Sequence, residues 1–260
     1  MYLGQGKISA FILFLFFFIV LFVCYYLARR GRKFAIRKEI TALEMIPSAV
    51  GRATEMGKVI HAASGGSSTT SWRGPHVVAG MTILGYAAEL AAKNGVPLYI
   101  SSQEPDQLVI ADDVLRSAYL RGGKPEMYKR EYVLYHGRED GSYVAGVWGF
   151  LGREKPAVQF LFGGFGGEAI LFAEQGNRIG CLQIAATPTT LQVPFFAVSC
   201  DYLMIGDEVF AAGCLISGDP IDTSLIVGED VLKLMIMALS TLGAISATFA
   251  SNWLINLLKV

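Results

Sequence analysis

The chain has 260 residues, and its 22 basic and 22 acidic side chains give a formal net charge of zero. This balance provides no global positive field and therefore disfavours binding to DNA or RNA. Hydrophobic residues make up 53% of the chain and the mean hydropathy is +0.44, which is too apolar for a wholly soluble protein and predicts segments in a lipid bilayer.

The first element along the chain is an uncharged run over residues 8–27, ISAFILFLFFFIVLFVCYYL. At 1.5 Å per residue it reaches across a hydrocarbon core of about 30 Å, so it predicts a transmembrane helix. A signal peptide is the alternative, but the basic residues follow the run and no small-x-small cleavage site is present. By the positive-inside rule the N-terminus lies outside and the next segment is cytoplasmic. The basic residues after the run are Arg29, Arg30, Arg32, Lys33, Arg37 and Lys38, against Lys7 before it.

The segment that follows alternates short apolar stretches with helix-like stretches, which predicts an α/β domain over residues 29–230. A helix over residues 34–57 comes first, with a break or kink expected at Pro47. Six strands with helical crossovers favour a Rossmann-like, mostly parallel sheet. A helix over residues 189–200 is expected to be short or irregular because it contains Pro194. The strands are expected at residues 58–64, 96–102, 131–137, 157–165, 181–187 and 201–206.

A polar loop at residues 64–74, SGGSSTTSWRG, follows the first expected strand. In a parallel sheet this is the carboxyl edge, where open α/β folds bind ligands. The hydroxyl groups and Arg73 are suited to an anion, and Trp72 is suited to stacking on a ring. Two other interpretations stay open: a mobile loop without a ligand, or a contact surface for a partner protein.

A glycine-rich turn at residues 163–167 follows the fourth expected strand and precedes a helix. Together with Ala169 it fits G-x-G-x-x-A, a permitted form of the dinucleotide fingerprint. The candidate cofactor-binding residues are therefore Gly164, Gly166 and Gly167. Two features count against a nucleotide: no acid ends the following strand, and Glu168 would repel a nearby phosphate. The favoured interpretation is a tight junction between strand and helix, and no cofactor is assigned.

No catalytic or metal-binding constellation is evident in the sequence. The only histidines, His61, His76 and His136, are far apart and lack the spacing of metal ligands. No G-x-S-x-G motif and no P-loop are present. The four cysteines form no C-x-x-C pair and are expected to be reduced. These features do not favour an enzyme.

A second apolar run, over residues 234–258, is also long enough to cross the bilayer. The predicted arrangement is thus an N-terminal transmembrane helix at residues 1–28, the cytoplasmic domain, and a C-terminal transmembrane helix at residues 231–260, with both termini outside. Small residues recur in the second run at Gly243, Ala247 and Ser251, a spacing that lets helix backbones approach closely. This helix is expected to pack on protein, either on the first helix or on another subunit.

Two stretches, SAVGRATEMGK and LQIAATPTTLQVPFFAVSCDYLMIGDEVFAA, together with the flanking apolar helices, resemble an uncharacterised family of bacterial and archaeal membrane proteins. The resemblance covers most of the α/β domain. It implies a membrane-anchored domain of unknown function and supplies no catalytic residues.

The sequence as a whole predicts a membrane-anchored scaffold or assembly subunit whose partners are the lipid bilayer and either further copies of itself or another membrane protein. The alternative is a protein that binds a nucleotide or small anion at residues 163–167 and 64–74. Transport is a weaker third possibility, because two helices per chain form a pore only in an oligomer and neither helix contains a buried charge.

Overall fold

The computed structural model describes residues 8–32, 34 and 39–248. The chain divides into two compact units, one of Met1–Arg37 with Ser217–Val260 and one of Lys38–Ile216. The second unit is the α/β unit, and the first contains the long terminal helices, so we call it the helix unit. The predicted boundary at residue 230 falls inside a helix of the helix unit that begins at Pro220.

The α/β unit is built on a single six-stranded sheet with the order β3-β2-β1-β4-β5-β6, in which every pair of neighbours is parallel. The predicted Rossmann-like α/β fold and its six strands are confirmed. The order follows from helical crossovers that add β2 and β3 on one side of β1, and β4, β5 and β6 on the other. The strands are β1 (Ile60–Ala63), β2 (Leu98–Ser102), β3 (Val133–Tyr135), β4 (Val158–Phe162), β5 (Leu182–Thr187) and β6 (Tyr202–Ile205).

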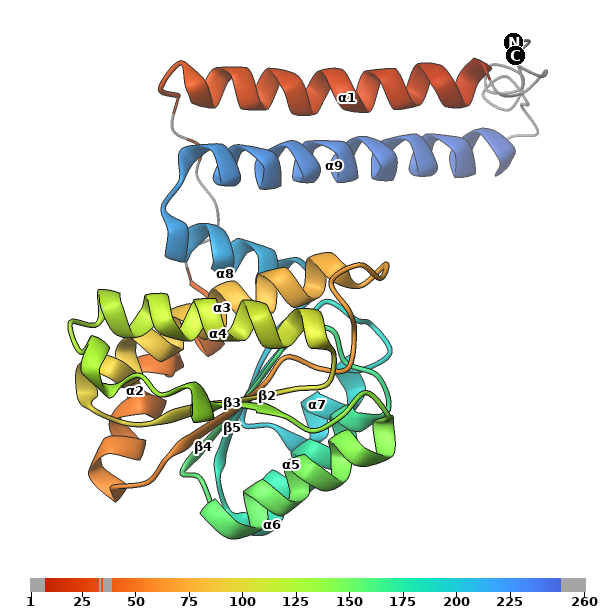
Figure 1. The fold of residues 1–260 in the computed structure, drawn as a ribbon. Coiled ribbons are helices and arrows are strands. Elements are labelled where there is room, and N and C mark those ends of the chain that lie inside the picture. Colours follow the sequence, from red (N-terminus) through yellow and green to blue (C-terminus); the bar gives the residue numbers. More distant parts are fainter. Residues whose placement is uncertain (1–7, 33, 35–38, 249–260) are drawn as a thin grey trace. The chain divides into compact units, whose positions relative to one another are not determined.

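Helices cover both faces of the sheet, as Figure 1 shows. One face packs against α2 (Thr41–Met56), α3 (Gly74–Asn94), α4 (Pro105–Arg121) and α8 (Asp207–Ser217). The other face packs against α5 (Asp140–Glu154), α6 (Glu168–Ile179) and α7 (Val193–Ser199). Two short 3-10 helices, η1 (Pro125–Met127) and η2 (Arg130–Tyr132), lead into β3.

The two prolines within helices behave differently. α2 continues through Pro47, so the predicted break does not occur. Pro47 is exposed, while Ile46, Ala49 and Val50 anchor the helix in the core on both sides of it in sequence. Pro194 lies in the first turn of α7, where a missing N–H costs nothing, and α7 is short, as predicted.

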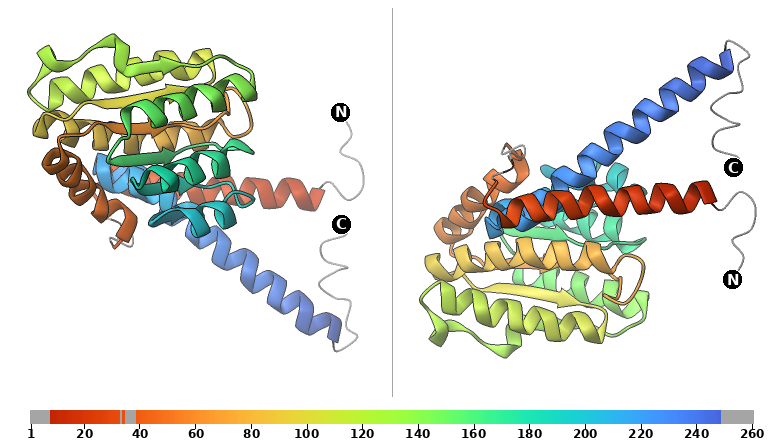
Figure 2. Two further views of the ribbon diagram at one scale, coloured as in Figure 1. Left: turned by 90° about the horizontal axis from the view of Figure 1, so that it is seen from below. Right: turned by 90° about the horizontal axis from the view of Figure 1, so that it is seen from above.

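The helix unit contains α1 (Ile8–Arg29) and α9 (Pro220–Thr248), which pack against each other. Figure 2 shows them diverging from the region where α1 ends and α9 begins. α1 carries a segment, Ala10–Arg29, that is long and apolar enough to cross a membrane. Of the second predicted crossing only residues 234–248 are described, which is shorter than a bilayer requires, so the two-pass topology stays a prediction.

Small side chains form the contact between α1 and α9. A Cβ atom added to Gly228 would lie 3.0 Å from Leu21 Cδ2 and 3.5 Å from Cys24 Sγ, so the glycine allows the two backbones to approach. The buried residues of the helix unit include Cys24, Ala28, Ser224 and Leu232. Sequence reasoning missed this seam and chose one further along α9. In that predicted seam Gly243 is half-buried, whereas the side chain of Ala247 and all of Ser251 lie outside the described residues.

Candidate functional site

The loops after β1 and β4 meet at the carboxyl edge of the sheet. β1 and β4 are neighbours, yet the chain leaves β1 toward β2 and leaves β4 toward β5. In open α/β folds this change of direction is where ligands bind. The strand order therefore brings together the two segments singled out in the sequence, residues 64–74 and 163–167.

Glycine is required where these two loops touch. Gly65 has φ +82°, and a Cβ atom there would overlap the carbonyl oxygen of Gly164. Gly163 also has a positive φ, +144°, and the N–H of Gly164 donates to the carbonyl oxygen of Ser64 at 3.2 Å. Any larger residue at position 65 would separate the loops, so these glycines serve the close approach of two backbones.

A carboxylate of the protein itself fills the glycine turn. Oε1 of Glu168, on the first turn of α6, accepts hydrogen bonds from the N–H of Gly66 at 2.8 Å and of Gly166 at 2.9 Å. Glu168 is only 7% exposed. Converging backbone N–H groups at a helix start are the groups that bind an anion in nucleotide-binding folds. Here two of them are already satisfied, so the turn is a closed junction.

The three predicted cofactor-binding glycines lie together at this junction. A Cβ atom on Gly164 would lie 3.0 Å from Ser67 Cβ, whereas nothing lies within 4 Å of one on Gly167. A Cβ atom on Gly166 would lie 2.9 Å from Glu168 Oε2 and 3.8 Å from Arg73 Nη1. The charged groups of Glu168 and Arg73 thus flank Gly166 from different loops.

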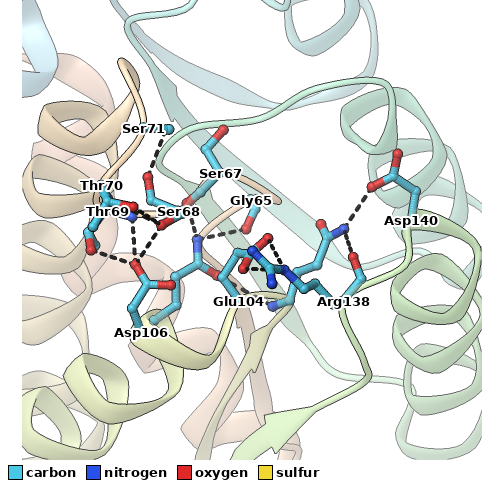
Figure 3. A network of polar contacts seen from close by, with 12 residues as sticks. Gly65, Ser67, Ser68, Thr69, Thr70, Ser71, Glu104, Asp106, Arg138 and Asp140 are labelled. Carbon is cyan, nitrogen blue, oxygen red and sulfur yellow. Dashed lines mark hydrogen bonds and ion pairs between the residues drawn. The ribbon is translucent and has the colours of Figure 1, made fainter.

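The polar loop at residues 64–74 is fastened to the start of α4, as Figure 3 shows. Asp106 accepts hydrogen bonds from the N–H of Thr69 at 2.6 Å and from Ser68 Oγ at 3.1 Å. Gln107 Nε2 donates to the carbonyl oxygens of Gly65 at 3.0 Å and Ser67 at 2.7 Å. Burial raises the pKa of Asp106, but the hydrogen bonds from Thr69 and Ser68 outweigh it and leave the pKa below its ordinary value.

A second set of contacts ties the end of β2 to the segment before α5 (Figure 3). Gln103 Nε2 donates to the carbonyl oxygen of Arg138 at 2.9 Å and to Asp140 Oδ1 at 2.7 Å. Arg138 forms an ion pair with Glu104 at 3.1 Å. Oε1 of Gln103 is buried and has no hydrogen-bond partner. With the Asp106 contacts, this leaves most polar groups at the edge engaged with other parts of the protein.

Arg73 and Trp72 are the exception. The guanidinium carbon of Arg73 lies 4.6 Å from the ring centre of Trp72, and Trp72 is 75% exposed. Among the described residues Arg73 has no ion-pair partner, and its Nε is buried without a hydrogen-bond partner. Burial, and then the nearby Arg73, lowers the pKa of His76, whose ring lies 6.0 Å from Trp72. A cation on an exposed aromatic ring is able to receive an anionic group.

Two of the three histidines meet through a serine. His61 Nε2 on β1 lies 2.9 Å from Ser101 Oγ on β2, and His136 Nε2 lies 3.1 Å from the same oxygen. Burial, and to a smaller extent His136, lowers the pKa of His61 to about 3, and burial also lowers the pKa of His136. Both rings are therefore neutral at pH 7. Sequence reasoning missed this bridge because its members come from three separate segments: β1, β2 and the residue after β3.

This bridge does not have the geometry of a nucleophilic site. Ser101 and His61 are fully buried, so a substrate cannot reach the hydroxyl group. The part of the chain that the structure describes contains no group of three or more His, Cys, Asp or Glu residues placed to hold a metal ion. The groups open to a ligand or partner are thus Arg73 and Trp72, beside a glycine turn closed by Glu168.

No curated protein and no solved structure matches the chain. The family match covers the helices at both ends and the α/β unit between them. Over residues 1–258 the chain matches the family described as Domain of unknown function (DUF6754), and it belongs to that family.

Proposed function

We propose that the protein is a membrane-anchored scaffold or assembly subunit that presents its α/β unit at the cytoplasmic face. The observation that carries this proposal is the surface of α1. Large apolar side chains on several sides of this helix are exposed, which is costly in water and favourable in lipid. They include Ile12 at 60%, Phe14 at 69%, Phe16 at 44% and Phe22 at 55% exposure.

The end of α1 supports a cytoplasmic location for the α/β unit. Basic residues follow the apolar segment, and the guanidinium group of Arg30 lies 4.6 Å from the ring centre of Tyr26. Tyrosine and arginine are typical of the inner membrane boundary. A second crossing by residues 234–258 would return the C-terminus to the outside, so both termini would lie there.

The α/β unit supports a scaffold better than a nucleotide-binding enzyme. Its glycine turn is closed by Glu168, and its buried serine–histidine bridge has no access to a substrate. Large apolar side chains near its carboxyl edge remain exposed, as expected of a surface that contacts a partner protein. These are Trp72 and Leu191, each at 75% exposure.

Membrane fractionation tests the anchoring. We expect the full-length protein to resist alkaline carbonate extraction and its α/β unit to be cleaved by protease only after the cytoplasmic face is exposed. Replacing both Phe14 and Phe18 by Asp should increase the fraction that carbonate extracts, because α1 would no longer anchor the chain. The matched control is Val109→Asp on α4, where a 70% exposed side chain takes the same charge. Extraction of the wild-type protein by carbonate would overturn the proposal.

One observation favours a second function, binding of a small anionic ligand with a planar ring. Arg73 is stacked on Trp72, lacks a carboxylate partner among the described residues and has a buried, unpartnered Nε. A thermal-shift screen with nucleotides and aromatic acids tests it. A genuine ligand should stabilise the wild type and lose its effect in Arg73→Met. Arg178→Met is the control, since Arg178 is exposed and paired with Glu174. An equal ligand-induced thermal shift in Arg73→Met and Arg178→Met would show that Arg73 does not bind the ligand.

A further inference from the structure

The face of α9 that points away from α1 carries charged side chains. They lie at the depth where the apolar segment of α1 would be surrounded by lipid. Gly228 packs against Leu21 and Cys24, which lie about 9 Å and 5 Å inside the end of the apolar run at Leu27. Because α9 runs antiparallel to α1, residues after Gly228 lie deeper still. Asp230 is thus held about 10 Å inside the hydrocarbon region if α1 spans it, so the part of α9 at membrane depth begins before residue 234, the predicted start of the second crossing.

These charges cannot be shielded by α1. At about 100° per residue, Asp230 is about 200° around the helix from Gly228, on the opposite side. Asp230 is exposed and has no hydrogen-bond or ion-pair partner among the residues that the structure describes. Glu229 pairs with Lys233 at 2.9 Å, and both are also substantially exposed, at 51% and 40%. Ionisable side chains at such depth are expensive in lipid and almost always face protein or water.

The same face continues as a strip of small side chains. Ser240, Ala244 and Thr248 lie on the side away from Gly228 and are exposed. The Thr248 hydroxyl donates to the carbonyl oxygen of Ala244 at 2.9 Å, so it needs no partner from another helix. Small residues permit close approach of a second helix backbone, whereas the bulky phenylalanines of α1 suit lipid. Met237, 63% exposed, lies on the same side between the charged and the small residues, so this docking face of α9 combines charged, apolar and small side chains.

We propose that this face binds the same face of a second copy of the chain, so that two α9 helices pack in parallel within the membrane. The proposal rests on the membrane anchoring proposed above. A second copy is the proposed partner because the face carries both positive and negative charges within one helical turn. Two copies with the same membrane orientation place each residue at the same depth as its counterpart. Asp230 of each copy then lies within one helical turn of Lys233 of the partner subunit.

A charge-swap experiment on the full-length protein tests the proposal. Membrane retention is measured first by carbonate extraction. A protein that carbonate removes from the membrane would overturn the proposed anchoring, which is a separate result from a failure of the docking face. The oligomeric state in lipid nanodiscs and mild detergent is then measured by native mass spectrometry and light scattering. We expect a dimer for the wild type.

Asp230→Asn keeps the size of the side chain and should weaken the dimer about three- to tenfold. Asp230→Lys should weaken it further, and Asp230→Lys combined with Lys233→Glu should restore it. The matched control is Asp222→Lys, at the start of α9 beyond the depth of the apolar run, which should leave the dimer unchanged.

The other outcomes each overturn the proposal. A wild-type monomer in nanodiscs would show that the face stays open to lipid or water. A dimer unchanged by Asp230→Lys would show that the copies meet elsewhere. A different membrane protein that co-purifies in place of a second copy, and is lost with Asp230→Lys, would show that this face has a foreign partner.

Discussion

The two faces of the central sheet differ in chemistry although the same strands supply both. Toward α3 and α4, a row of apolar side chains crosses the sheet in register: Ile100, Ala62, Phe160 and Ile184. Toward α5 and α6, the adjacent row contains Tyr99, His61, Gln159 and Gln183. The two glutamines and the histidine are fully buried. The first face is thus apolar along this row, whereas the second adds individually matched polar groups to its own apolar cluster with α5, α6 and α7.

The polar face is the more exacting of the two. Gln183 Nε2 donates to the carbonyl oxygens of Ala173 at 2.8 Å and Ser199 at 3.2 Å, which fixes α6 and the end of α7 relative to β5. His61 Nδ1, Gln159 Nε2 and Gln183 Oε1 are buried without a partner. A buried polar group without a hydrogen bond costs free energy, whereas an apolar side chain needs only contact. The faces should therefore respond differently to substitution.

The largest effect is expected on the apolar face. Phe160 is fully buried and its ring stacks on Phe162 at 5.2 Å. Phe160→Ala should lower the free energy of unfolding by about 3–5 kcal/mol, because it removes buried contacts and leaves a cavity. Denaturant titration of the full-length protein in detergent measures this loss. Val109→Ala, on an exposed position of α4, should change it by less than about 0.5 kcal/mol. A loss below about 1 kcal/mol at Phe160 would contradict this account.

Much of the apolar face could be predicted from sequence, because runs such as Val158–Phe162 are short, β-rich and bounded by turns. The neighbours of each strand could not, since strand order depends on crossovers between distant segments. The polar row was also hidden by the expected strand bounds. The expected starts at residues 58, 157 and 181 displace His61 by one position, whereas the observed starts of β1, β4 and β5 place His61, Gln159 and Gln183 side by side.

The candidate site was predictable in position but not in chemistry. Residues 64–74 were predicted because loops after parallel strands gather at one edge, and residues 163–167 because they fit a glycine pattern between a strand and a helix. The sequence showed Glu168 as a charge that would repel phosphate. It could not show that this carboxylate bonds to Gly66, because that contact depends on β1 and β4 being neighbours.

The next effect is expected where a helix meets the polar row. A Cβ atom on Gly176 of α6 would overlap Oε1 of both Gln159 and Gln183. Alanine favours helices by about 1 kcal/mol over glycine, but overpacking costs about 1–3 kcal/mol, and here two fixed amides must move. Gly176→Ala should therefore destabilise the protein by about 2 kcal/mol in the same titration. Gly152→Ala on α5 has nothing within 4 Å and should be neutral or stabilising. Similar values for both would show that the amides are free to move.

A pH-dependent effect should distinguish the polar face from the apolar one. The pKa of His61 falls to about 3 on folding. Below pH 6.5, the pKa of the ring in the unfolded chain, His61 therefore binds a proton in the unfolded chain but not in the folded one. This contribution to stability is complete above pH 6.5 and should have fallen by about 1.4 kcal/mol at pH 5.5.

Unfolding titrations at pH 7.5, 6.5 and 5.5 measure this effect. The difference between wild type and His61→Gln should shrink as the pH falls, because the variant lacks this titrating ring. Phe160→Ala serves as the apolar control, and its difference from wild type should not depend on pH. A constant difference for His61→Gln would mean that the ring is able to take up a proton in the folded protein.

The smallest effect is expected at Glu168, where the polar row gives way to the carboxyl edge. Glu168→Gln retains an oxygen that accepts from Gly66 and Gly166 but removes the charge that strengthens both hydrogen bonds. The free energy of unfolding at pH 7 should fall by about 1 kcal/mol, whereas Glu174→Gln in an exposed ion pair should change it by less than about 0.5 kcal/mol. If Glu168→Gln instead stabilises the protein and gains affinity for inorganic phosphate, the carboxylate blocks an anion site and does not simply join the loops. That result would show that the glycine turn is an anion-binding site and not a structural junction between two loops.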